Sequence, residues 1–416
     1  MQVIGSQMLW ILFVILFFWL SSAEEISKVE TGIGLDDSSE RTIDFRTKRV
    51  PAVQLITRHN YSVETHNVTT LDGYILANFR IPSSNRCTKL GPKPVVFLQH
   101  GLLLAADAFL VTGPRTGLPF MLADACFDVW LSNCRGTRYS RRHTTLKDTQ
   151  QKFWQFSFHE MGMQDLPAQI DYVLVTTNQS ALHFVCYSQG CTTLMILLSM
   201  RPEYNKKIKT ANLLAPSVFM KHSLTWGLKI VKPIFMMLPD GELLPIKGLL
   251  TSVVKLMCKS KATKRLCASI YLLLSGNKSK HTNKSVIPNL VATHPSGLST
   301  RQPKHYIQLK DSGKFRQYDF GPKKNRKTYG QASPPEYPLE KVNPLTPINL
   351  FYSAGDNTVS IKDILKLASK LPRSVKHKIK EPAWDHLDFI FGKTIDKVIN
   401  LPVINIINAF ENSQKE

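Results

Sequence analysis

Short apolar runs alternate with segments of helical periodicity along the first half of the chain. The apolar runs predict buried strands at Pro94–Gln99, Phe127–Leu131 and Ala181–Cys186. Helical spacing predicts helices at Pro119–Ala125, Trp154–Val175 and Gly190–Leu198. Because apolar residues stand at successive positions of each strand rather than only at every second one, the pattern favours a parallel sheet covered by helices on both faces.

Further patterns extend this sheet at both ends. The runs Ser62–Thr69 and Tyr74–Ile81 flank a hairpin-turn signal at Leu71-Asp72-Gly73, which predicts an antiparallel pair at the sheet edge. A strand, a helix and a last strand are predicted near the C-terminus, at Ile348–Tyr352, Ile361–Ser369 and Val375–Ile379. The intervening stretch Ser217–Pro344 combines apolar helical segments with basic loops and is interpreted as a mostly helical insertion between sheet strands.

The N-terminus has the pattern of a secretory signal peptide. Thirteen apolar residues, Met8–Leu20, are followed by Ser21-Ser22-Ala23, which predicts cleavage after Ala23. The run is shorter than the roughly 20 residues that a transmembrane helix needs. Its leading residues lack Lys and Arg, so an uncleaved anchor remains the alternative.

The charge of the chain is strongly basic. Its 416 residues contain 53 Lys and Arg against 31 Asp and Glu, a formal balance of +22. Such a balance favours anionic partners such as membrane surfaces, but a generally solvated basic surface is the preferred interpretation. Local clusters lie at Lys259–Arg265 and Lys323–Lys327. Neither has aromatic residues interleaved for base stacking, so nucleic acid is not an expected partner.

A secretory context gives meaning to the cysteines and to the glycosylation triplets. With seven cysteines, at least one thiol stays free. Cys258 and Cys267 enclose a short basic loop and are the best disulfide candidates, whereas Cys186 and Cys191 lie on apolar stretches and are expected to be buried free thiols. Pairing among Cys87, Cys126 and Cys134 stays open. Asn-x-Ser/Thr triplets predict glycan sites at Asn60, Asn67, Asn178, Asn277 and Asn283.

The candidate nucleophile is Ser188, which stands between a predicted strand and a predicted helix. The segment Cys186-Tyr187-Ser188-Gln189-Gly190 resembles a nucleophile elbow, in which a strained turn lifts a serine hydroxyl above the end of a parallel sheet. The usual pattern is Gly-x-Ser-x-Gly, and here Cys186 replaces the first glycine. A small apolar cysteine is expected to be tolerated there.

Two later residues complete the chemistry that a serine nucleophile needs. Asp356 follows the predicted strand Ile348–Tyr352, and His386 follows the last predicted strand. The order Ser, Asp, His is that of α/β-hydrolase triads, in which the histidine takes the serine proton and the aspartate orients the imidazole. Asp385 is a rival acid, but adjacent residues rarely turn their side chains toward one another.

An oxyanion site is expected beside the elbow. The backbone N–H of Gln189, at a helix start, and that of Leu102, after His100-Gly101, are the candidate donors. His100 is expected to shape its loop rather than to act as a base. No Cys/His spacing suggests a zinc site, and we expect no metal or cofactor.

Several segments together resemble the acid lipases of the α/β-hydrolase fold, the group that contains gastric lipase and lysosomal acid lipase. The resemblance covers the chain from about Val53 to the C-terminal helices. It is carried by Thr69–Leu76, Leu98-Gln99-His100-Gly101-Leu102, Asp128–Ser140, Asp165–Tyr172, Tyr187-Ser188-Gln189-Gly190 and His386-Leu387-Asp388-Phe389.

The resemblance implies an esterase for neutral lipids with Ser188, Asp356 and His386 as triad and Leu102 and Gln189 as oxyanion donors. It also implies that the insertion is a cap with a lid, pinned by a Cys258–Cys267 disulfide. The expected organisation is a signal peptide (1–23), a loose N-terminal segment (24–52), the α/β-hydrolase core in two parts (53–216 and 345–416) and the cap (217–344).

We therefore expect a serine hydrolase that cleaves acylglycerols or sterol esters at a lipid–water interface, secreted or, alternatively, lysosomal. An anionic membrane or lipid surface is a further expected partner. One alternative is a catalytically weak lipid-binding relative that keeps the pocket, which Cys186 favours. Another is a secreted protein that binds polyanions, which the basic charge favours.

Overall fold

The computed structural model describes residues 50–223, 232–233, 235–243, 279–286, 290 and 293–414. These residues belong to one compact unit, Phe45–Glu416. The predicted signal peptide, most of the 24–52 segment and much of the predicted insertion lie outside the described residues. Within the described ranges, no helix has both the length and the apolar character needed to cross a membrane.

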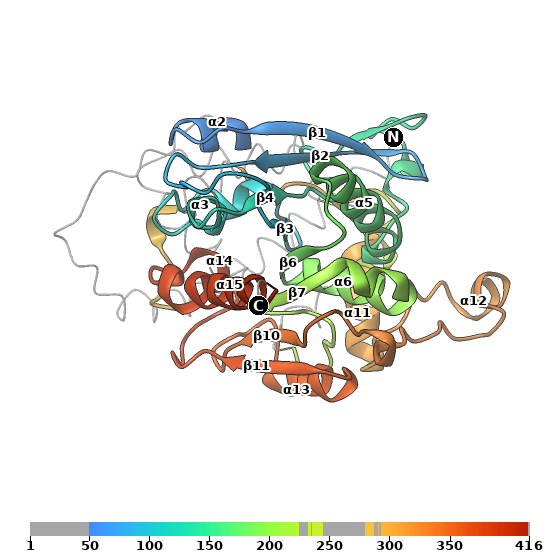
Figure 1. The fold of residues 1–416 in the computed structure, drawn as a ribbon. Helices are drawn as coiled ribbons and strands as arrows, with labels where there is room; N and C mark the ends of the chain where they lie inside the picture. The colour runs from blue at the N-terminus through green and yellow to red at the C-terminus, as the bar shows by residue number, and fades with distance from the viewer. Residues whose placement is uncertain are drawn as a thin grey trace, which may run out of the picture. The chain divides into compact units, whose positions relative to one another are not determined.

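The fold is built on a nine-stranded, mainly parallel sheet (Figure 1). The strand order is β1-β2-β4-β3-β6-β7-β10-β11, and β5 pairs with β2. The strands from β4 to β11 run parallel, while β1, β2 and β5 form antiparallel pairs at one edge. Their bounds are β1 Glu64–Thr69, β2 Tyr74–Ile81, β3 Val95–Gln99, β4 Asp128–Leu131, β5 Arg142–His143, β6 Leu182–Tyr187, β7 Ile208–Leu214, β10 Ile348–Tyr352 and β11 Ser374–Lys378.

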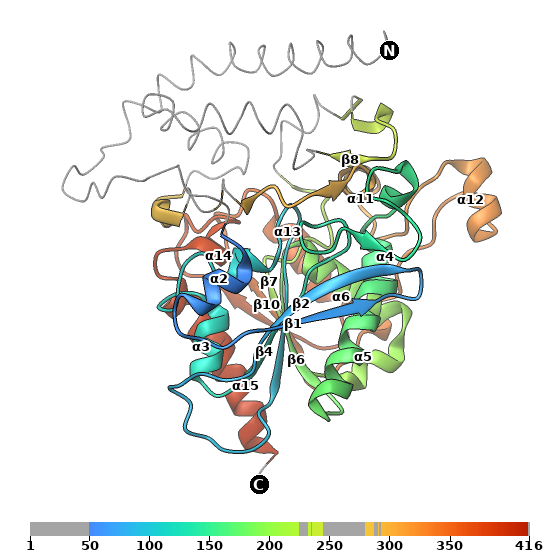
Figure 2. The same cartoon turned by 90° about the horizontal axis from the view of Figure 1, so that it is seen from above.

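Helices cover both faces of this sheet (Figure 2). Those on one face are α5 Leu166–Thr177, α6 Gln189–Met200 and α13 Ile361–Lys370, and those on the other are α2 Ala52–Thr57, α3 Leu118–Asp124 and α15 Leu401–Ser413. Successive residues of β3 pack on opposite faces of the sheet. Val95 and Phe97 belong to the core beneath α5, α6 and α13, whereas Val96 and Leu98 belong to the core beneath α2, α3 and α15. A strand that is buried on both faces is mainly apolar, which explains why apolar residues stand at successive positions in these runs.

The strands and most helices of the core agree closely with the sequence pattern. The predicted edge pair is β1 and β2, which pair in antiparallel register around Gly73 at φ 93°. The predicted helix Trp154–Val175 is instead broken into a 3₁₀ turn, a short α-helix, a π-helical turn and a regular helix: η3 Gln151–Trp154, α4 Phe158–Glu160, η4 Met161–Asp165 and α5.

The break in this helix has a local cause at each point. Ser157 and Glu160 form a reciprocal capping box, so a helix begins at Phe158 rather than at Trp154. Pro167 has no N–H to donate into the preceding turn, and the turn before it widens to a π-helix. The helical spacing of apolar residues in the sequence does not reveal where an α-helix changes to a 3₁₀ or π-helical turn.

The described part of the predicted insertion contains helices and a small sheet. Helix α11 spans Arg301–Ser312 and helix α12 spans Pro322–Tyr329. The strands β8 Glu242–Leu243 and β9 Leu298–Ser299 pair in antiparallel register. The apolar run Leu249–Met257 lies outside the described residues. The parallel strands β3, β6, β7 and β10 all end at one edge of the sheet, where ligand sites of α/β proteins form.

Candidate active site

Ser188 occupies a strained turn between β6 and α6. Its backbone adopts φ 51° and ψ −115°, a conformation that costs a non-glycine residue roughly 1–3 kcal/mol. The turn is held by two backbone hydrogen bonds, from Ser188 N to Leu214 O at 2.9 Å and from Cys191 N to Ser188 O at 3.0 Å. A Cβ at Gly190 would lie only 2.6 Å from Gln99 O, so glycine is required where α6 passes the end of β3.

The structure brings Ser188, His386 and Asp356 together in one hydrogen-bonded chain. Ser188 Oγ lies 2.9 Å from His386 Nε2, and His386 Nδ1 lies 2.8 Å from Asp356 Oδ2. All three side chains are buried. A carboxylate at Nδ1 makes that nitrogen the proton donor and leaves Nε2 free to accept the serine proton.

The two partners of Ser188 are themselves held in place. Asp356 Oδ1 accepts hydrogen bonds from the backbone N–H groups of Thr358 and Val359, both at 2.8 Å. The Tyr187 hydroxyl donates to the carbonyl of His386 at 3.0 Å. These contacts orient the carboxylate and the histidine loop, which are 30 residues apart in sequence.

Asp385 occupies a separate position, as expected for a residue adjacent to His386. Its carboxylate accepts hydrogen bonds from the backbone N–H groups of His386 at 2.6 Å and of Asn357 at 3.2 Å. Burial raises the pKa of Asp385 to about 6. Asp385 therefore braces the loops that carry Asp356 and His386, and the imidazole bonds to Asp356.

The loop after β3 runs directly beside the serine. A Cβ at Gly101 would lie 2.8 Å from Tyr187 Cδ1 and 3.1 Å from Ser188 Cβ, so this backbone approach needs glycine. Leu102 follows, and Gln189 opens α6 on the other side of Ser188. The first N–H groups of a helix have no partner within the helix, which makes the Gln189 N–H available to a ligand.

His100 sets the direction of the Leu102 N–H. Its Nε2 accepts a hydrogen bond from Cys134 N at 3.2 Å, so Nδ1 carries the proton and donates to Gly101 O at 2.8 Å. Burial lowers the pKa of His100 to about 4, which keeps the ring neutral. Because the Gly101 carbonyl and the Leu102 N–H belong to one planar trans peptide, fixing the first aims the second the opposite way.

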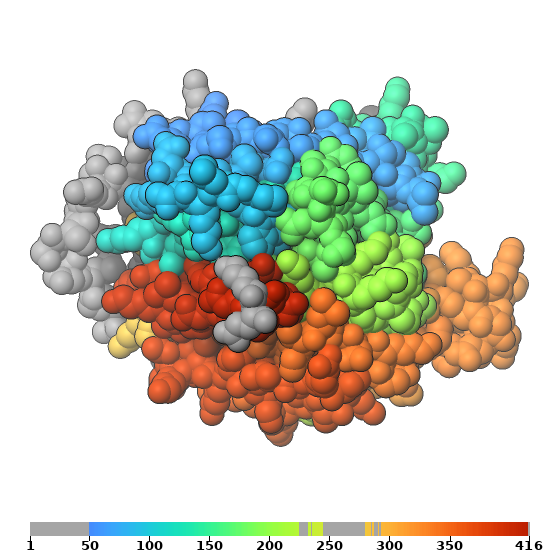
Figure 3. All heavy atoms as spheres, viewed as in Figure 1, coloured from blue at the N-terminus to red at the C-terminus, as the bar shows by residue number. Residues whose placement is uncertain are grey.

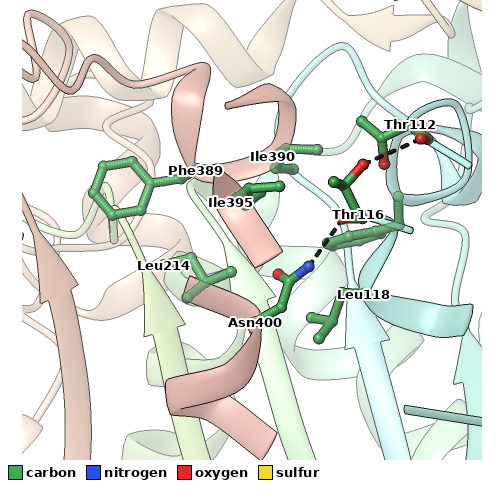
Figure 4. Close-up of a pocket in the computed structure, with 9 residues that line it drawn as sticks. Thr112, Thr116, Leu118, Leu214, Phe389, Ile390, Ile395 and Asn400 are labelled. Atoms are coloured by element: carbon green, nitrogen blue, oxygen red, sulfur yellow. Dashed lines mark hydrogen bonds between the residues drawn. The ribbon is translucent and has the colours of Figure 1, made fainter. Parts of the chain in front are cut away.

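Two small cavities lie near this edge of the sheet. The first encloses about 190 Å³ beside the loop, and its lining includes His100, Gly101, Arg135, Gln189 and Gln302. The second encloses about 220 Å³ behind the histidine loop (Figure 4), where Asn400 Nδ2 donates to Thr116 O at 2.9 Å. Ser188 and His386 line neither cavity.

The prediction that Cys186 and Cys191 are free thiols is wrong, because they form a disulfide that spans the elbow. Cys186 lies in the same alternating set of β6 as Leu182 and Phe184, which faces α6, and Cys191 lies in the first turn of that helix. Their Cα atoms are 5.1 Å apart, within bonding range.

The other described cysteines resolve the pairing that the sequence left open. Cys87 pairs with Cys126, and Cys134 is a buried free thiol. Burial raises the pKa of Cys134 above its ordinary value, which disfavours the reactive thiolate. Cys258 and Cys267 lie outside the described residues, so their pairing stays a prediction.

Removing the Cys186–Cys191 cross-link is expected to destabilise the protein. The paired change Cys186→Ala/Cys191→Ala should lower the free energy of unfolding by about 2 kcal/mol, since the cross-link closes a short loop in the unfolded chain. Denaturant titration measures this. Cys134→Ala is the control, because it removes a buried sulfur without opening a cross-link. In the wild type, the tryptic peptide that holds both cysteines should be lighter by two hydrogens before reduction; an unchanged mass would contradict the disulfide.

Three of the predicted glycan sites lie on exposed asparagines, at Asn60, Asn67 and Asn178. Asn283 is half-buried, and its side chain accepts hydrogen bonds from Ser285. Asn277 lies outside the described residues.

Several contacts around the site were not predicted from the sequence. They are the Tyr187 hydroxyl on His386, the two backbone donors to Asp356, and the hydrogen bond from Gln302 Nε2 to Gln189 Oε1 at 3.2 Å. Tyr187 stands next to Ser188 in a recognisable motif, but its partner is 199 residues away. No local sequence signal connects such residues.

Comparison with known proteins places the chain among lipases. Residues 94–393 match the family described as alpha/beta hydrolase fold, and residues 52–113 match the partial alpha/beta-hydrolase lipase region. Human gastric triacylglycerol lipase is 36% identical over 85% of this chain and 90% of its own length. Lipase 1 of Drosophila melanogaster is 34% identical over 87% of this chain and 81% of its own length.

Two further similarities agree with this placement. A candidate lysosomal acid lipase/cholesteryl ester hydrolase of Crotalus adamanteus is 37% identical over 82% of this chain and 86% of its own length. A solved structure of a candidate lipase from Acinetobacter baumannii covers 90% of this chain and 99% of that chain with a TM-score of 0.50 and 14% identity, which supports the fold alone. From the family matches and these relatives, the chain belongs to the lipases of the α/β-hydrolase fold.

Proposed function

We propose that this protein hydrolyses carboxylic esters of neutral lipids, with Ser188 as nucleophile, His386 as general base and acid, and Asp356 as the group that orients His386. The observation that carries the proposal is the continuous hydrogen-bonded chain from Ser188 Oγ through His386 to Asp356. The substrate class rests on relatives named for triacylglycerol and cholesteryl ester hydrolysis.

The first half of the reaction forms an acyl-enzyme. Ser188 Oγ attacks the ester carbonyl carbon while His386 Nε2 takes its proton. The carbonyl oxygen becomes an oxyanion, for which the N–H groups of Leu102 and Gln189 are the donors. When the tetrahedral intermediate collapses, the carbon–oxygen bond to the alcohol breaks, and His386 returns its proton to the leaving oxygen.

The second half releases the fatty acid. Water attacks the acyl carbon, His386 Nε2 takes a proton from it, and the bond to Ser188 Oγ breaks as that oxygen regains a proton from His386. Asp356 keeps its negative charge throughout and stabilises the imidazolium that forms in each half. The neutral, buried His100 takes no proton in this scheme and acts only on the direction of the Leu102 N–H.

The remaining features of the proposal concern the rest of the chain. We place the hydrolase core in residues 53–216 and 345–416 and a cap in 217–344, with Cys258–Cys267 as its cross-link. An apolar cap covers the acyl-binding surface in water and moves aside for substrate. With a cleaved signal peptide and glycans on the exposed asparagines, the protein is secreted or, alternatively, lysosomal.

The catalytically weak alternative has lost its main support. It rested on Cys186, which stands where the usual elbow pattern has its first glycine. Cys186 is instead joined to Cys191 on the α6 side, and Ser188 still lies 2.9 Å from His386.

Covalent labelling tests the proposed nucleophile directly. A p-nitrophenyl alkylphosphonate should add one phosphonyl group per protein, located at Ser188 by peptide mapping, because a phosphonate traps an activated serine. His386→Ala should suppress the labelling. Trioleoylglycerol emulsions and cholesteryl oleate then test the substrate class. Labelling elsewhere, or none, would contradict the role of Ser188, whereas labelling without lipid hydrolysis would contradict only the substrate.

A further inference from the structure

Helix α12 carries a group of exposed cations. Lys323, Lys324, Arg326 and Lys327 are all exposed on this one short helix. Among the described residues, no ion pair joins any of the four to a carboxylate, although the nearby Lys314 and Arg316 are paired with Glu336 and Asp319. Figures 1 and 3 show α12 projecting from the neighbouring elements. Its positive charge is therefore available to an anionic partner.

The segment that carries these cations is anchored through a buried amide. Asn325 is fully buried on the inner side of α12. Its Nδ2 donates to Asp319 Oδ1 at 2.7 Å and to Ala332 O at 2.8 Å, and its Oδ1 accepts from Phe320 N at 2.9 Å. Gln308 of α11 bonds the backbone of Asp319 in both directions, each at 2.9 Å. The cations are thus presented on a fixed support.

Two exposed methionines lie on the segment next to this support. Met236 is 39% exposed and Met237 is 85% exposed. Arg301 connects their segment to α12: its guanidinium pairs with Asp240 at 2.6 Å and lies 5.9 Å from the Phe320 ring centroid. Lys324 Nζ lies 4.5 Å from the same ring. We call the two methionines and the four α12 cations the α12–Met237 surface.

This surface is one helix away from the proposed active site. Arg301 and Gln302 are consecutive residues of α11. Arg301 bonds Asp240, in the segment that carries the two methionines, and lies beside Phe320, which precedes α12. Gln302 Nε2 donates to Gln189 Oε1, next to Ser188. Tyr306 of the same helix contacts Thr192 of α6 at 3.1 Å. Helix α11 therefore contacts the segments that carry the surface and also helix α6, which begins directly after Ser188.

We propose that the α12–Met237 surface docks the protein on an anionic lipid surface. Its cations face the negatively charged head groups, and Met236 and Met237 enter the interfacial layer. Cations alone would suit any polyanion, but exposed flexible apolar side chains beside them favour a lipid surface, where binding combines charge attraction with apolar burial. The benefit to catalysis rests on the proposed function, whereas the binding itself does not need Ser188.

Vesicle binding by the full-length Ser188→Ala variant tests the proposal without lipid turnover. Binding to phosphatidylcholine vesicles that contain phosphatidylserine should exceed binding to phosphatidylcholine alone and should weaken with salt. Changing the four α12 cations to glutamine should weaken it at least tenfold, since each cation near an anionic membrane adds roughly fivefold in affinity. The matched control changes four exposed lysines elsewhere to glutamine, at Lys362, Lys370, Lys376 and Lys378. This control removes the same number of positive charges and should lose much less affinity for the vesicles.

A second variant tests the apolar part of the surface. Met236→Ser/Met237→Ser should reduce vesicle binding severalfold and leave heparin binding unchanged. The proposal is overturned if the α12 variant and the lysine control bind vesicles equally well. It is also overturned if the methionine variant binds vesicles as well as the wild type, because the surface would then be a site for polyanions in general. In an active background, the α12 variant should hydrolyse a soluble butyrate ester normally. Failure of the protein to hydrolyse any ester would reject the proposed function and leave the binding result standing.

Discussion

Replacing Ser188 with alanine is expected to abolish ester hydrolysis, with kcat falling by about 10⁶-fold. The reason is that Ser188 Oγ, which lies 2.9 Å from His386 Nε2, is the nucleophile in the proposed mechanism. The measurement is hydrolysis of p-nitrophenyl butyrate by purified proteins. Ser199→Ala is the matched control, because Ser199 is buried in α6, the helix that follows Ser188, and its hydroxyl donates to the local carbonyl of Ile196. The control should keep wild-type activity.

The partners of Ser188 should behave as one unit with it. His386→Ala should lower kcat about as much as Ser188→Ala, and the double variant should be no slower than either single one, because the proposed mechanism uses both residues in the same step. Losses that multiply in the double variant would mean that Ser188 and His386 contribute separately. Thermal unfolding of each variant should show that the fold survives, since the alanine changes remove few packing contacts.

The elements of the site were predictable because topology places the ends of parallel strands together. Asp356 follows β10 and Ser188 follows β6, and a strand-end position can be read from an apolar run and the polar residues after it. The bounds of β2 and β10 equal the predicted ranges for the same reason: strongly apolar runs end at turn residues. The distances within the site were not predictable, because they depend on the loop that carries His386 and on the contact from Tyr187.

The disulfide across the elbow shows what the linear pattern hides. Cys186 and Cys191 both lie in apolar stretches, which is why burial was predicted, and both are indeed buried. Pairing depends on whether residue 186 faces the same side of the sheet as the helix that contains residue 191. The strand alternation of Leu182, Phe184 and Cys186 contained that information, but only once the position of α6 was known.

Arg135 received no role from the sequence, although it lies in Asp128–Ser140, one of the segments that carry the family resemblance. Charged residues usually lie at the surface, so a sequence gives no reason to expect a buried guanidinium. Its partners Asp165 and Asp72 are 30 and 63 residues away along the chain. The side chain of Arg135 is only 1% exposed. Because this charge is buried, Arg135 is the side chain whose removal we expect to lower the free energy of unfolding most.

Arg135→Ala is expected to lower the free energy of unfolding by about 3–5 kcal/mol, because it leaves a buried carboxylate without its counter-charge. Arg135 Nε and N bond the two oxygens of Asp165 at 2.6 and 3.0 Å. Its other two nitrogens bond Asp72 at 2.6 and 2.9 Å. The guanidinium also stacks on Tyr74, 4.0 Å from the ring centroid. Among the described residues, Arg135 is the cation that forms an ion pair with Asp165 and with Asp72.

The unfolding free energy that Arg135→Ala loses should increase with pH. Burial raises the pKa of Asp165 to about 6 even beside Arg135, and removing the guanidinium raises it further. A carboxyl whose pKa is higher in the folded than in the unfolded protein destabilises the fold as pH rises above the unfolded value. Urea titrations should therefore show a smaller loss for Arg135→Ala at about pH 5 than at about pH 8. Arg86→Ala is the control, since Arg86 pairs with Asp124 but is 72% exposed, and should cost under about 1 kcal/mol at either pH. Equal losses for the two variants would show that the buried network does not support the fold.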